Sequence, residues 1–250
     1  MYTLKKSLGQ HFLKDENISK KIVAALQPGV FKNLLEVGPG AGALTKYLLQ
    51  SPGINFKAVE VDEEKIDHLR SHFPQLENKL IHQSFLEIEK PFEEQFAIIG
   101  NFHYNISTEI LFKIIEWRED VACVIGMFQK EVAQRIAAGE GNKVYGVTSV
   151  LTQAFFDVQY LFEVSPGSFQ PPPKVKSAVI RLIPRQEFLE MSSEKEFFRL
   201  VKTAFNQRRK TLRNAVRDLF DKKILEAEIF NKRAEQLSVK EFAELTFKMK

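Results

Sequence analysis

The amino-acid sequence predicts an α/β fold with a Rossmann-like, doubly wound sheet, followed by a small all-α region. Short apolar runs alternate with amphipathic helical patterns over residues 15–183, and the first apolar run ends in a glycine-rich loop. After Pro184 the pattern is only helical. We therefore expect a domain boundary there, with one domain over residues 1–184 and a helical domain over residues 185–250.

The first half of the chain predicts a regular alternation of helices and buried strands. Asp15 can cap a helix that buries Ile18, Ile22, Val23 and Leu26. Apolar runs then predict strands at residues 34–37, 56–61, 80–83 and 96–99, with a helix over residues 44–49. Strands that alternate with helices in this way form a mostly parallel sheet.

The alternation continues in the second half. A helix is expected to start at Ser107 or Thr108 and to bury Ile110, Leu111 and Ile114. A fifth strand follows at residues 121–128 and a helix at residues 131–138. Two last strands, at 158–164 and 177–183, flank a proline-rich loop over residues 166–173.

Composition bounds the class of protein. With 44% hydrophobic and 27% charged residues, it is that of an ordinary soluble globular protein. The one cysteine, Cys123, lies in an apolar run and has no partner for an intrachain disulfide, so a reducing, cytoplasmic location is expected. The first six residues lack the apolar segment of a signal peptide, and the longest uncharged stretch, 144–156, is too short to span a bilayer.

A glycine-rich loop follows the first expected strand. Gly38, Gly40 and Gly42 let the backbone approach a ligand that faces the next helix N-terminus. An acidic residue about twenty positions later suits ribose hydroxyl groups, and Glu60 stands there. The spacing also fits NAD. Glu36 directly before the loop, and the lack of hydride-transfer candidates after it, favour S-adenosyl-L-methionine.

Residues 101–104, directly after the fourth expected strand, suggest what the cofactor is used for. Two acceptors, the Asn101 side-chain oxygen and the Phe102 main-chain carbonyl, would hold the amine of adenine with its lone pair directed at a methyl group. Tyr104 would stack on the base, which must first be extruded from structured RNA. Catalysis would rest on positioning, without a covalent enzyme intermediate or a metal. Taken alone, the same residues also fit an ordinary strand-end turn.

Positive charge is concentrated at the C-terminal end. Residues 185–250 contain 16 basic and 11 acidic residues, whereas the rest of the chain contains 20 and 21. The densest part, without acidic residues, contains Lys202, Arg208, Arg209, Lys210 and Arg213. Such a stripe is typical of a polyphosphate-binding surface, although a solvated helix face has the same appearance.

Six segments over nearly the whole sequence carry a family resemblance. They are Gly9-Gln10-His11-Phe12-Leu13 with Asp15, the loop Glu36 to Gly42, Asn101 to Thr108, Gln129-Lys130-Glu131-Val132, Pro166 to Ser177, and Ala204 to Asn214. Together they resemble the ribosomal RNA adenine N6,N6-dimethyltransferases, a family of class I S-adenosylmethionine-dependent methyltransferases. The first and last segments look more like the small-subunit branch than the erythromycin-resistance methylases of large-subunit rRNA.

The resemblance implies a substrate, a partner and a set of site residues. The enzyme would dimethylate two adjacent adenosines in the 3′-terminal hairpin loop of 16S rRNA, in an immature 30S subunit rather than in naked RNA. Phe169 would stack on the target adenine opposite Tyr104, and the C-terminal helices would bind the rRNA backbone. The residues implied to contact the cofactor are His11, Leu13, Gly38, Glu60, Ser84 and Asn101. Nothing in the sequence suggests an obligate dimer, so a monomer is expected.

Two residues depart from the family pattern. His103 stands where the family normally has proline, which should loosen the loop that aims Asn101 and could place a titratable group near the base. Ser84 stands where an aspartate normally accepts the cofactor's adenine amine, so we expect weaker cofactor binding.

Three functions therefore remain open from the sequence: the small-subunit rRNA dimethyltransferase, an adenine-N6 enzyme for another nucleic acid such as 23S rRNA or DNA, and a non-catalytic assembly factor.

Overall fold

The computed structural model describes residues 11–250 apart from residues 28, 30 and 188, so Gly9 and Gln10 of the first motif lie outside the described residues. The chain divides into two compact units. The first comprises Met1–Ala133 and Gln159–Pro184, and the second comprises Gln134–Val158 and Arg185–Lys250. The second unit thus includes a segment that the sequence analysis placed in the first domain. The assignment of catalysis and RNA binding to separate domains stays a prediction.

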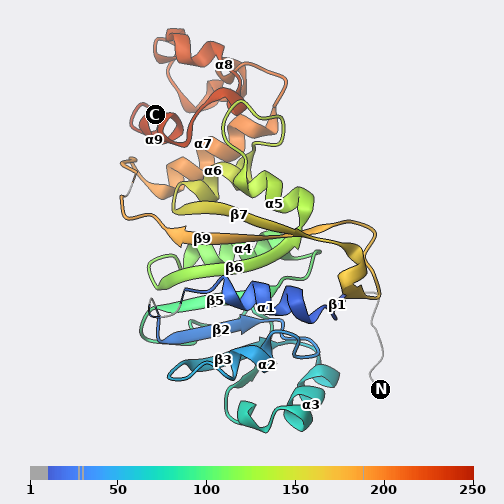
Figure 1. Ribbon diagram of the computed structural model, residues 1–250. Helices are drawn as coiled ribbons and strands as arrows, with labels where there is room; N and C mark the ends of the chain where they lie inside the picture. Colours follow the sequence, from blue (N-terminus) through green and yellow to red (C-terminus); the bar gives the residue numbers. More distant parts are fainter. Residues whose placement is uncertain (1–10, 28, 30, 188) are drawn as a thin grey trace. The chain divides into compact units, whose positions relative to one another are not determined.

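A seven-stranded sheet dominates the first unit, in the order β4-β3-β2-β5-β6-β9-β7 (Figure 1). Its strands are β2 (Asn33–Val37), β3 (Asn55–Glu60), β4 (Leu80–His82), β5 (Phe96–Asn101), β6 (Val121–Gln129), β7 (Phe156–Val164) and β9 (Ser177–Pro184). The pairs from β4 to β6 are parallel, and β9 is antiparallel to β6. The Rossmann-like, mostly parallel sheet and its seven predicted strands are confirmed.

Helices lie on both faces of this sheet, with α1 in front of it and α4 behind it in Figure 1. The helices of this part of the chain are α1 (Glu16–Ala24), α2 (Thr45–Leu48), α3 (Glu63–His72), α4 (Ser107–Glu116) and α5 (Lys130–Ala137). Asp15 caps α1 as predicted, because its side chain accepts hydrogen bonds from the N–H groups of Asn17 and Ile18. The parallel register brings the carboxyl ends of β2, β3 and β5 to one edge, where ligands bind in such sheets.

The helix α3 and a small pair of strands in the first unit were not predicted. β1 (Phe12–Leu13) and β8 (Phe169–Gln170) form a separate antiparallel pair, in which Leu13 lies opposite Phe169. Two residues are too few to give a strand periodicity, so the sequence pattern could not show this pair. It ties the start of the described chain to the proline-rich loop.

The second unit is helical in the part of the chain that the structure describes. It contains α6 (Val147–Gln153), α7 (Glu194–Asn206), α8 (Leu212–Ala215) and α9 (Val239–Thr246), joined in part by short 3₁₀ turns. α7 packs against α6, α8 and α9 and buries Phe197, Leu200, Val201, Ala204 and Phe205. Among all described residues, no helix has the length and apolar character that a bilayer crossing requires.

Candidate active site

The loop between β2 and α2 brings three glycines to the carboxyl edge of the sheet. Gly38, Gly40 and Gly42 have φ angles of 68°, 58° and 82°, in the left-handed region that other side chains disfavour. A Cβ atom on Gly40 would lie 3.4 Å from the Phe12 ring. A Cβ atom on Gly42 would clash with the ring of Phe73. Gly42 therefore serves packing against Phe73, whereas at Gly40 the positive φ angle rather than a lack of space favours glycine.

Two adjoining hollows open at this edge. The first contains about 470 Å³ of space not filled by atoms and the second about 370 Å³, and both volumes include space open to solvent. Gly38 and His103 line both hollows. The other predicted cofactor residues divide between them, with His11, Leu13, Glu36, Gly40 and Asn101 at the first and Glu60 and Ser84 at the second. Gly42, which is buried, lines neither.

Glu36 is a buried carboxyl group beside the first hollow. The Thr45 hydroxyl donates a hydrogen bond of 2.7 Å to its Oε2. The pKa of Glu36 is raised to about 8, chiefly by burial; the Thr45 hydrogen bond opposes the rise and the charge of Glu60 adds to it. Burial dominates because the charged form is poorly solvated there. At neutral pH the Glu36 side chain is therefore largely protonated.

Glu60 ends β3 and is held by backbone N–H groups. Its Oε1 accepts from Val61 at 3.0 Å and from Asp62 at 3.1 Å, and its Oε2 accepts from Gly40 at 3.2 Å. Lys65 Nζ lies 3.9 Å from Oε2. This arrangement fixes the carboxylate against the glycine loop, where a ribose would lie if Glu60 has its predicted role.

The segment at β1 links the site residues to the proline-rich loop. His11 donates from Nδ1 to the Pro171 carbonyl at 2.9 Å. The Asn101 side chain donates from Nδ2 to the His11 carbonyl at 3.2 Å. Since the amide nitrogen faces His11, Oδ1 of Asn101 is directed elsewhere, as an acceptor. The predicted acceptor atom is therefore fixed by a contact that the sequence did not show.

Phe102 anchors the backbone of this segment. Its N–H donates to the Met127 carbonyl at 3.1 Å, and its buried ring packs edge-on against Phe128 with 5.1 Å between centroids. Cβ atoms on Gly100 and Gly126 would come within 2.7 and 2.6 Å of the Phe102 ring. Packing of this ring, rather than a proline, thus fixes the backbone next to Asn101.

Tyr104 and Phe169, the two predicted stacking rings, differ in exposure. Tyr104 is half-buried, its hydroxyl group is hydrogen-bonded to the Ser177 hydroxyl at 2.5 Å, and its ring centroid lies 5.7 Å from that of His11. Phe169 is fully buried in the apolar cluster that also contains Leu13. The prediction that Phe169 faces the base does not match this position, because the ring is packed in the core. A stacking role would require its exposure and stays a prediction.

Ser84 and His103, the two departures from the family pattern, both lie at the hollows. Ser84 is half-buried and its Oγ accepts from the Leu86 N–H at 3.3 Å. A Cβ atom on Gly38 would lie 3.9 Å from Cε1 of His103. Burial and then the charge of Lys65 lower the pKa of His103. His103 was expected to place a titratable group near the base. It lies beside the glycine loop, and it is neutral at physiological pH.

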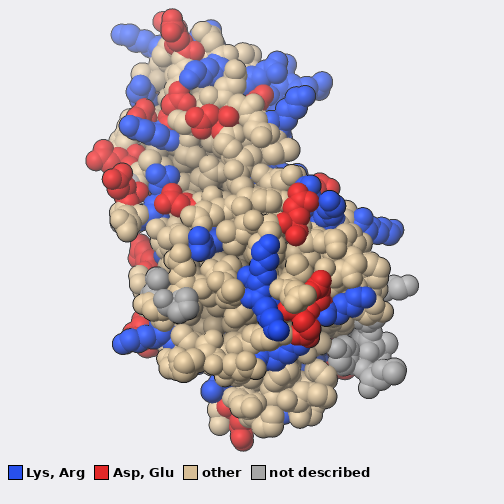
Figure 2. Space-filling view, in the orientation of Figure 1, with Lys and Arg blue, Asp and Glu red and all other residues tan. Residues whose placement is uncertain are grey.

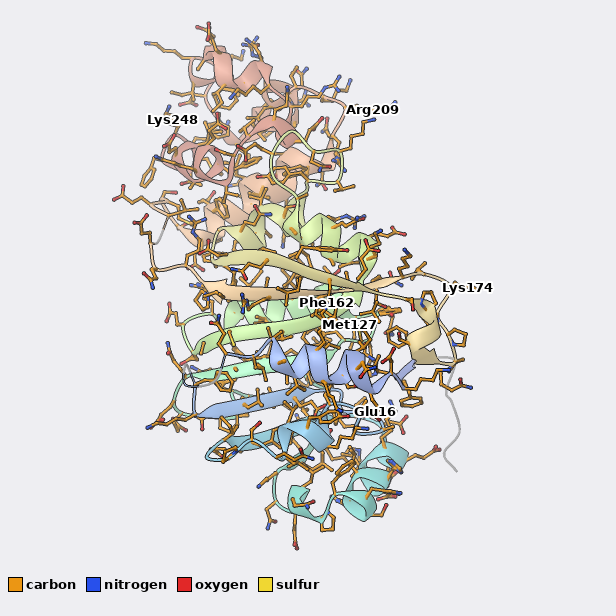
Figure 3. All side chains as sticks on the ribbon, in the orientation of Figure 1. Glu16, Met127, Phe162, Lys174, Arg209 and Lys248 are labelled. Atoms are coloured by element: carbon orange, nitrogen blue, oxygen red, sulfur yellow. The ribbon has the colours of Figure 1, made fainter. Side chains whose placement is uncertain are left out.

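The predicted RNA-binding residues lie in the second unit and are mostly exposed. Figure 2 shows Lys and Arg side chains over this unit, interspersed with Asp and Glu, and Figure 3 shows Arg209 extending away from the ribbon. The exposed residues are Lys202, Arg208, Arg209 and Lys210, whereas Arg213 is half-buried.

Two of these cations are engaged within the unit itself. Arg208 donates from one guanidinium nitrogen to the carbonyl groups of Lys143 and Tyr145, at 2.8 and 2.9 Å. Arg213 donates from Nε to the Leu225 carbonyl at 2.9 Å. Both therefore have a structural role that the charge pattern did not predict. Any contact of these two with phosphates would use their remaining N–H groups.

The residues of the site that sequence reasoning missed include Phe12, Lys65 and Ser177. Phe12 and Lys65 line the first hollow, and Ser177 bonds to Tyr104. Phe12 stands between two residues that were predicted, so its neighbours were a usable signal. Lys65 lies five positions after Glu60 on the next helix, and Ser177 lies in the last strand. Neither position has a local signal, because both contacts depend on the tertiary fold.

The family model described as "Ribosomal RNA adenine dimethylase" matches residues 1–249 of the sequence. The chain belongs to this family. The predicted family resemblance is thereby confirmed, and the chain is an S-adenosylmethionine-dependent rRNA adenine dimethyltransferase.

Curated proteins and solved structures agree with this family. A "Ribosomal RNA small subunit methyltransferase A" from Cytophaga hutchinsonii is 54% identical over 97% of this chain and 95% of that protein. A protein of the same name from Flavobacterium johnsoniae is 51% identical over 98% of this chain and 95% of that protein. A dimethyladenosine transferase from Plasmodium falciparum has a TM-score of 0.82 and 27% identity, with 94% of this chain and 96% of that chain covered.

Proposed function

We propose that this rRNA adenine dimethylase modifies two adjacent adenosines in the 3′-terminal hairpin loop of 16S rRNA, within an immature 30S subunit. The geometric observation that carries the proposal is the Asn101 amide. Its Nδ2 is held by the His11 carbonyl at 3.2 Å, so Oδ1 is available as an acceptor beside the first hollow. The small subunit as partner is supported by the names of relatives that are 54% and 51% identical.

The residues of the two hollows would divide the work of binding and orientation. S-adenosylmethionine supplies an electrophilic methyl group when it is bound. Gly38 and Gly40 give the backbone access to it, and Glu60 at the end of β3 would accept ribose hydroxyl groups. Ser84 would accept the adenine amine as a neutral group. These residues would bind and orient, without bonding covalently to either substrate.

The target base would be held at the end of β5. Asn101 Oδ1 and the Phe102 carbonyl would accept the two hydrogens of the adenine amine, and Tyr104 would stack on the ring. Both acceptors belong to a segment whose backbone is fixed by the hydrogen bond of the Phe102 N–H group and by packing of the Phe102 ring. Positioned acceptors of this kind stabilise the geometry in which the amine lone pair faces the methyl group, and they need no reorganisation during the reaction.

The two alternative functions have less support. A methylase of the erythromycin-resistance type would act on 23S rRNA, but the relatives with 54% and 51% identity are named small-subunit enzymes. A non-catalytic assembly factor would not need residues that bind the cofactor and the target base, yet Glu36, Glu60, Asn101 and Tyr104 are all present. We infer further that the enzyme works as a monomer.

The reaction is tested by transfer of labelled methyl groups from S-adenosylmethionine to undermethylated 30S subunits. We expect N6,N6-dimethyladenosine near the 3′ end of 16S rRNA, identified by mass. Asn101→Ala should reduce the rate by about a hundredfold or more, because it removes a positioned acceptor. Asn17→Ala, which removes an exposed amide on α1, is the matched control and should keep full activity. Tight binding of subunits without transfer would instead support the assembly-factor function.

RNA binding by the second unit gives a separate prediction. Affinity for 30S subunits should fall steeply with salt, and Arg209→Ala should reduce the slope of log affinity against log salt by about one. Arg209 is chosen because it is exposed and extends away from the ribbon (Figure 3). Lys248→Ala removes an exposed cation outside the stripe and is the control. An unchanged slope in Arg209→Ala would show that this residue does not contact rRNA phosphates.

A further inference from the structure

Lys65 places a buried ammonium group at the first hollow, and the proposed function has not used it. It lies in α3, shortly after the end of β3, and its side chain is 3% exposed. It lines the hollow together with His11, Glu36 and Asn101. Its Nζ lies 5.4 Å from the centroid of the Phe12 ring. A lysine is rarely buried unless its charge is paired.

Glu60 is a charge partner of Lys65, and the two charged atoms are not in hydrogen-bond contact with each other. Lys65 Nζ lies 3.9 Å from Oε2 of Glu60, beyond the usual N–H···O length of roughly 2.7–3.2 Å. Among the described residues, Oε1 accepts two backbone N–H groups and Oε2 accepts one. A carboxylate oxygen can accept two hydrogen bonds. The open acceptor position is therefore on Oε2, the oxygen next to Lys65.

We propose that Lys65 is a further cofactor-binding residue, whose ammonium group donates to a ribose hydroxyl of S-adenosylmethionine while Oε2 of Glu60 accepts that hydroxyl's hydrogen. The inference rests on the proposed role of Glu60 in binding the ribose. One oxygen can bond to both atoms, because their 3.9 Å separation is shorter than two hydrogen bonds of roughly 2.8 Å each. A hydroxyl group is both donor and acceptor, which matches this donor–acceptor pair.

The surroundings of Lys65 agree with this assignment. The charge of Lys65 is the second cause, after burial, that lowers the pKa of His103, while Glu60 and Asp62 oppose it. These four groups therefore lie within reach of one another. His103 lines both hollows, Lys65 the first and Glu60 the second. The Lys65–Glu60 pair thus lies where the hollows meet, which is where a ribose joins the adenine to the methionine part of the cofactor.

The test compares three ligands on two proteins by titration calorimetry. The ligands are S-adenosylhomocysteine and its 2′-deoxy and 3′-deoxy analogues, and the proteins are the wild type and Lys65→Met. We expect Lys65→Met to weaken S-adenosylhomocysteine binding by about tenfold or more, because a charge-assisted hydrogen bond is lost. One deoxy analogue should bind both proteins within about twofold, because it lacks the hydroxyl that Lys65 recognises. Equal weakening for all three ligands, or none, overturns the inference.

Controls separate this inference from the site and from folding. Lys57→Met removes another partly buried ammonium group of the first unit, bonded to the Pro91 carbonyl at 2.6 Å, and should leave all three affinities unchanged. If Lys65→Met lowers the ligand-free melting temperature sharply, the same titrations are repeated with Lys65→Gln. A smaller loss confined to the same hydroxyl supports the inference, and equal losses overturn it. If the wild type binds both deoxy analogues as tightly as S-adenosylhomocysteine, the result counts against the ribose role of Glu60 itself.

Discussion

At the scale of single residues, the hydrogen bond between Tyr104 and Ser177 joins two parts of the base site. The two hydroxyl oxygens lie 2.5 Å apart, and Ser177 is fully buried at the start of β9. Burial raises the pKa of Tyr104 and the Ser177 hydrogen bond lowers it. The phenol is therefore a neutral group at physiological pH. Its bond fixes the plane of a ring that would stack on the target base.

A double-mutant cycle tests this positioning. Ser177→Ala and Tyr104→Phe should each lower kcat/KM for 30S subunits by about fivefold, because each removes the same hydrogen bond of about 1 kcal/mol. The double variant should be no worse than either single one. Affinity for S-adenosylhomocysteine should stay unchanged in all three. Additive losses would show that the two hydroxyl groups act independently.

The residues at strand ends could be predicted, and the direction of several side chains could not. Glu60 and Asn101 were found because each ends an apolar run, and a parallel sheet brings such ends together. The burial of Phe169 and the turn of His103 toward Gly38 depend on packing between distant segments. Arg208 was predicted to bind RNA from its charge alone. The charge pattern does not show that its guanidinium group donates hydrogen bonds to the Lys143 and Tyr145 carbonyl groups.

At the scale of elements, the start of α1 is fastened to the loop before β8. The N–H groups of Lys14 and Asp15 donate to the Ser168 carbonyl at 2.9 and 3.3 Å. The Ser168 hydroxyl donates to Asp15 Oδ2 at 3.2 Å. The other carboxylate oxygen of Asp15 caps α1. One side chain thus holds the helix and the N-terminal side of the first hollow together.

Asp15→Ala should affect both stability and ligand binding. We expect a loss of about 1 kcal/mol in the free energy of unfolding, typical of a lost N-cap, and several-fold weaker binding of S-adenosylhomocysteine. Ser238→Ala is the matched control, because Ser238 caps α9 in the second unit. It should cost similar stability and leave ligand binding unchanged. Urea unfolding and calorimetry give the two readouts. Unchanged ligand binding in Asp15→Ala would show that the Asp15 cap does not contribute to binding at the first hollow.

Element prediction succeeded where the apolar pattern was strong. β2 is buried at all five residues, and Leu34, Leu35 and Val37 give it the apolar character of a buried parallel strand. The helix α6 was not predicted although Val147, Val150 and Leu151 have helical spacing, because its polar residues are all uncharged and contrast weakly with the apolar ones. The β1–β8 pair was missed for a different reason, because each strand has two residues.

At the scale of the whole molecule, the buried carboxyl of Glu36 makes stability depend on pH. Its pKa is about 8 in the folded protein, against a usual value of 4.5. Between these values the folded protein retains a proton that the unfolded chain has lost. The free energy of unfolding contributed by Glu36 therefore falls as pH rises through this window and levels off above it.

Glu36→Gln removes this dependence while keeping a partner for Thr45. Relative to the wild type, ligand-free Glu36→Gln should gain stability progressively from pH 5 to pH 8, by on the order of 1–4 kcal/mol. Urea unfolding followed by fluorescence of Trp117, the one tryptophan, reports on the first unit. Glu163→Gln is the contrasting control. Lys130 lowers the pKa of Glu163, so its replacement should give no gain at any pH. A pH-independent difference for Glu36→Gln would contradict the prediction.

The division of the chain into units was only partly visible in the sequence. The change to a purely helical pattern after Pro184 is local and could be seen. The membership of Gln134–Val158 in the second unit could not, because it depends on packing of α6 against α7, far apart along the chain.

The pairing of β1 with β8 also affects the order in which the protein matures during synthesis. Leu13 leaves the ribosome early, whereas its partner Phe169 follows only after roughly two thirds of the chain has been made. Until then the glycine loop and Glu60 can exist without the strand partner that secures His11 and Leu13. A growing chain is therefore expected to gain full cofactor affinity late, so that incomplete products would not sequester the methyl donor.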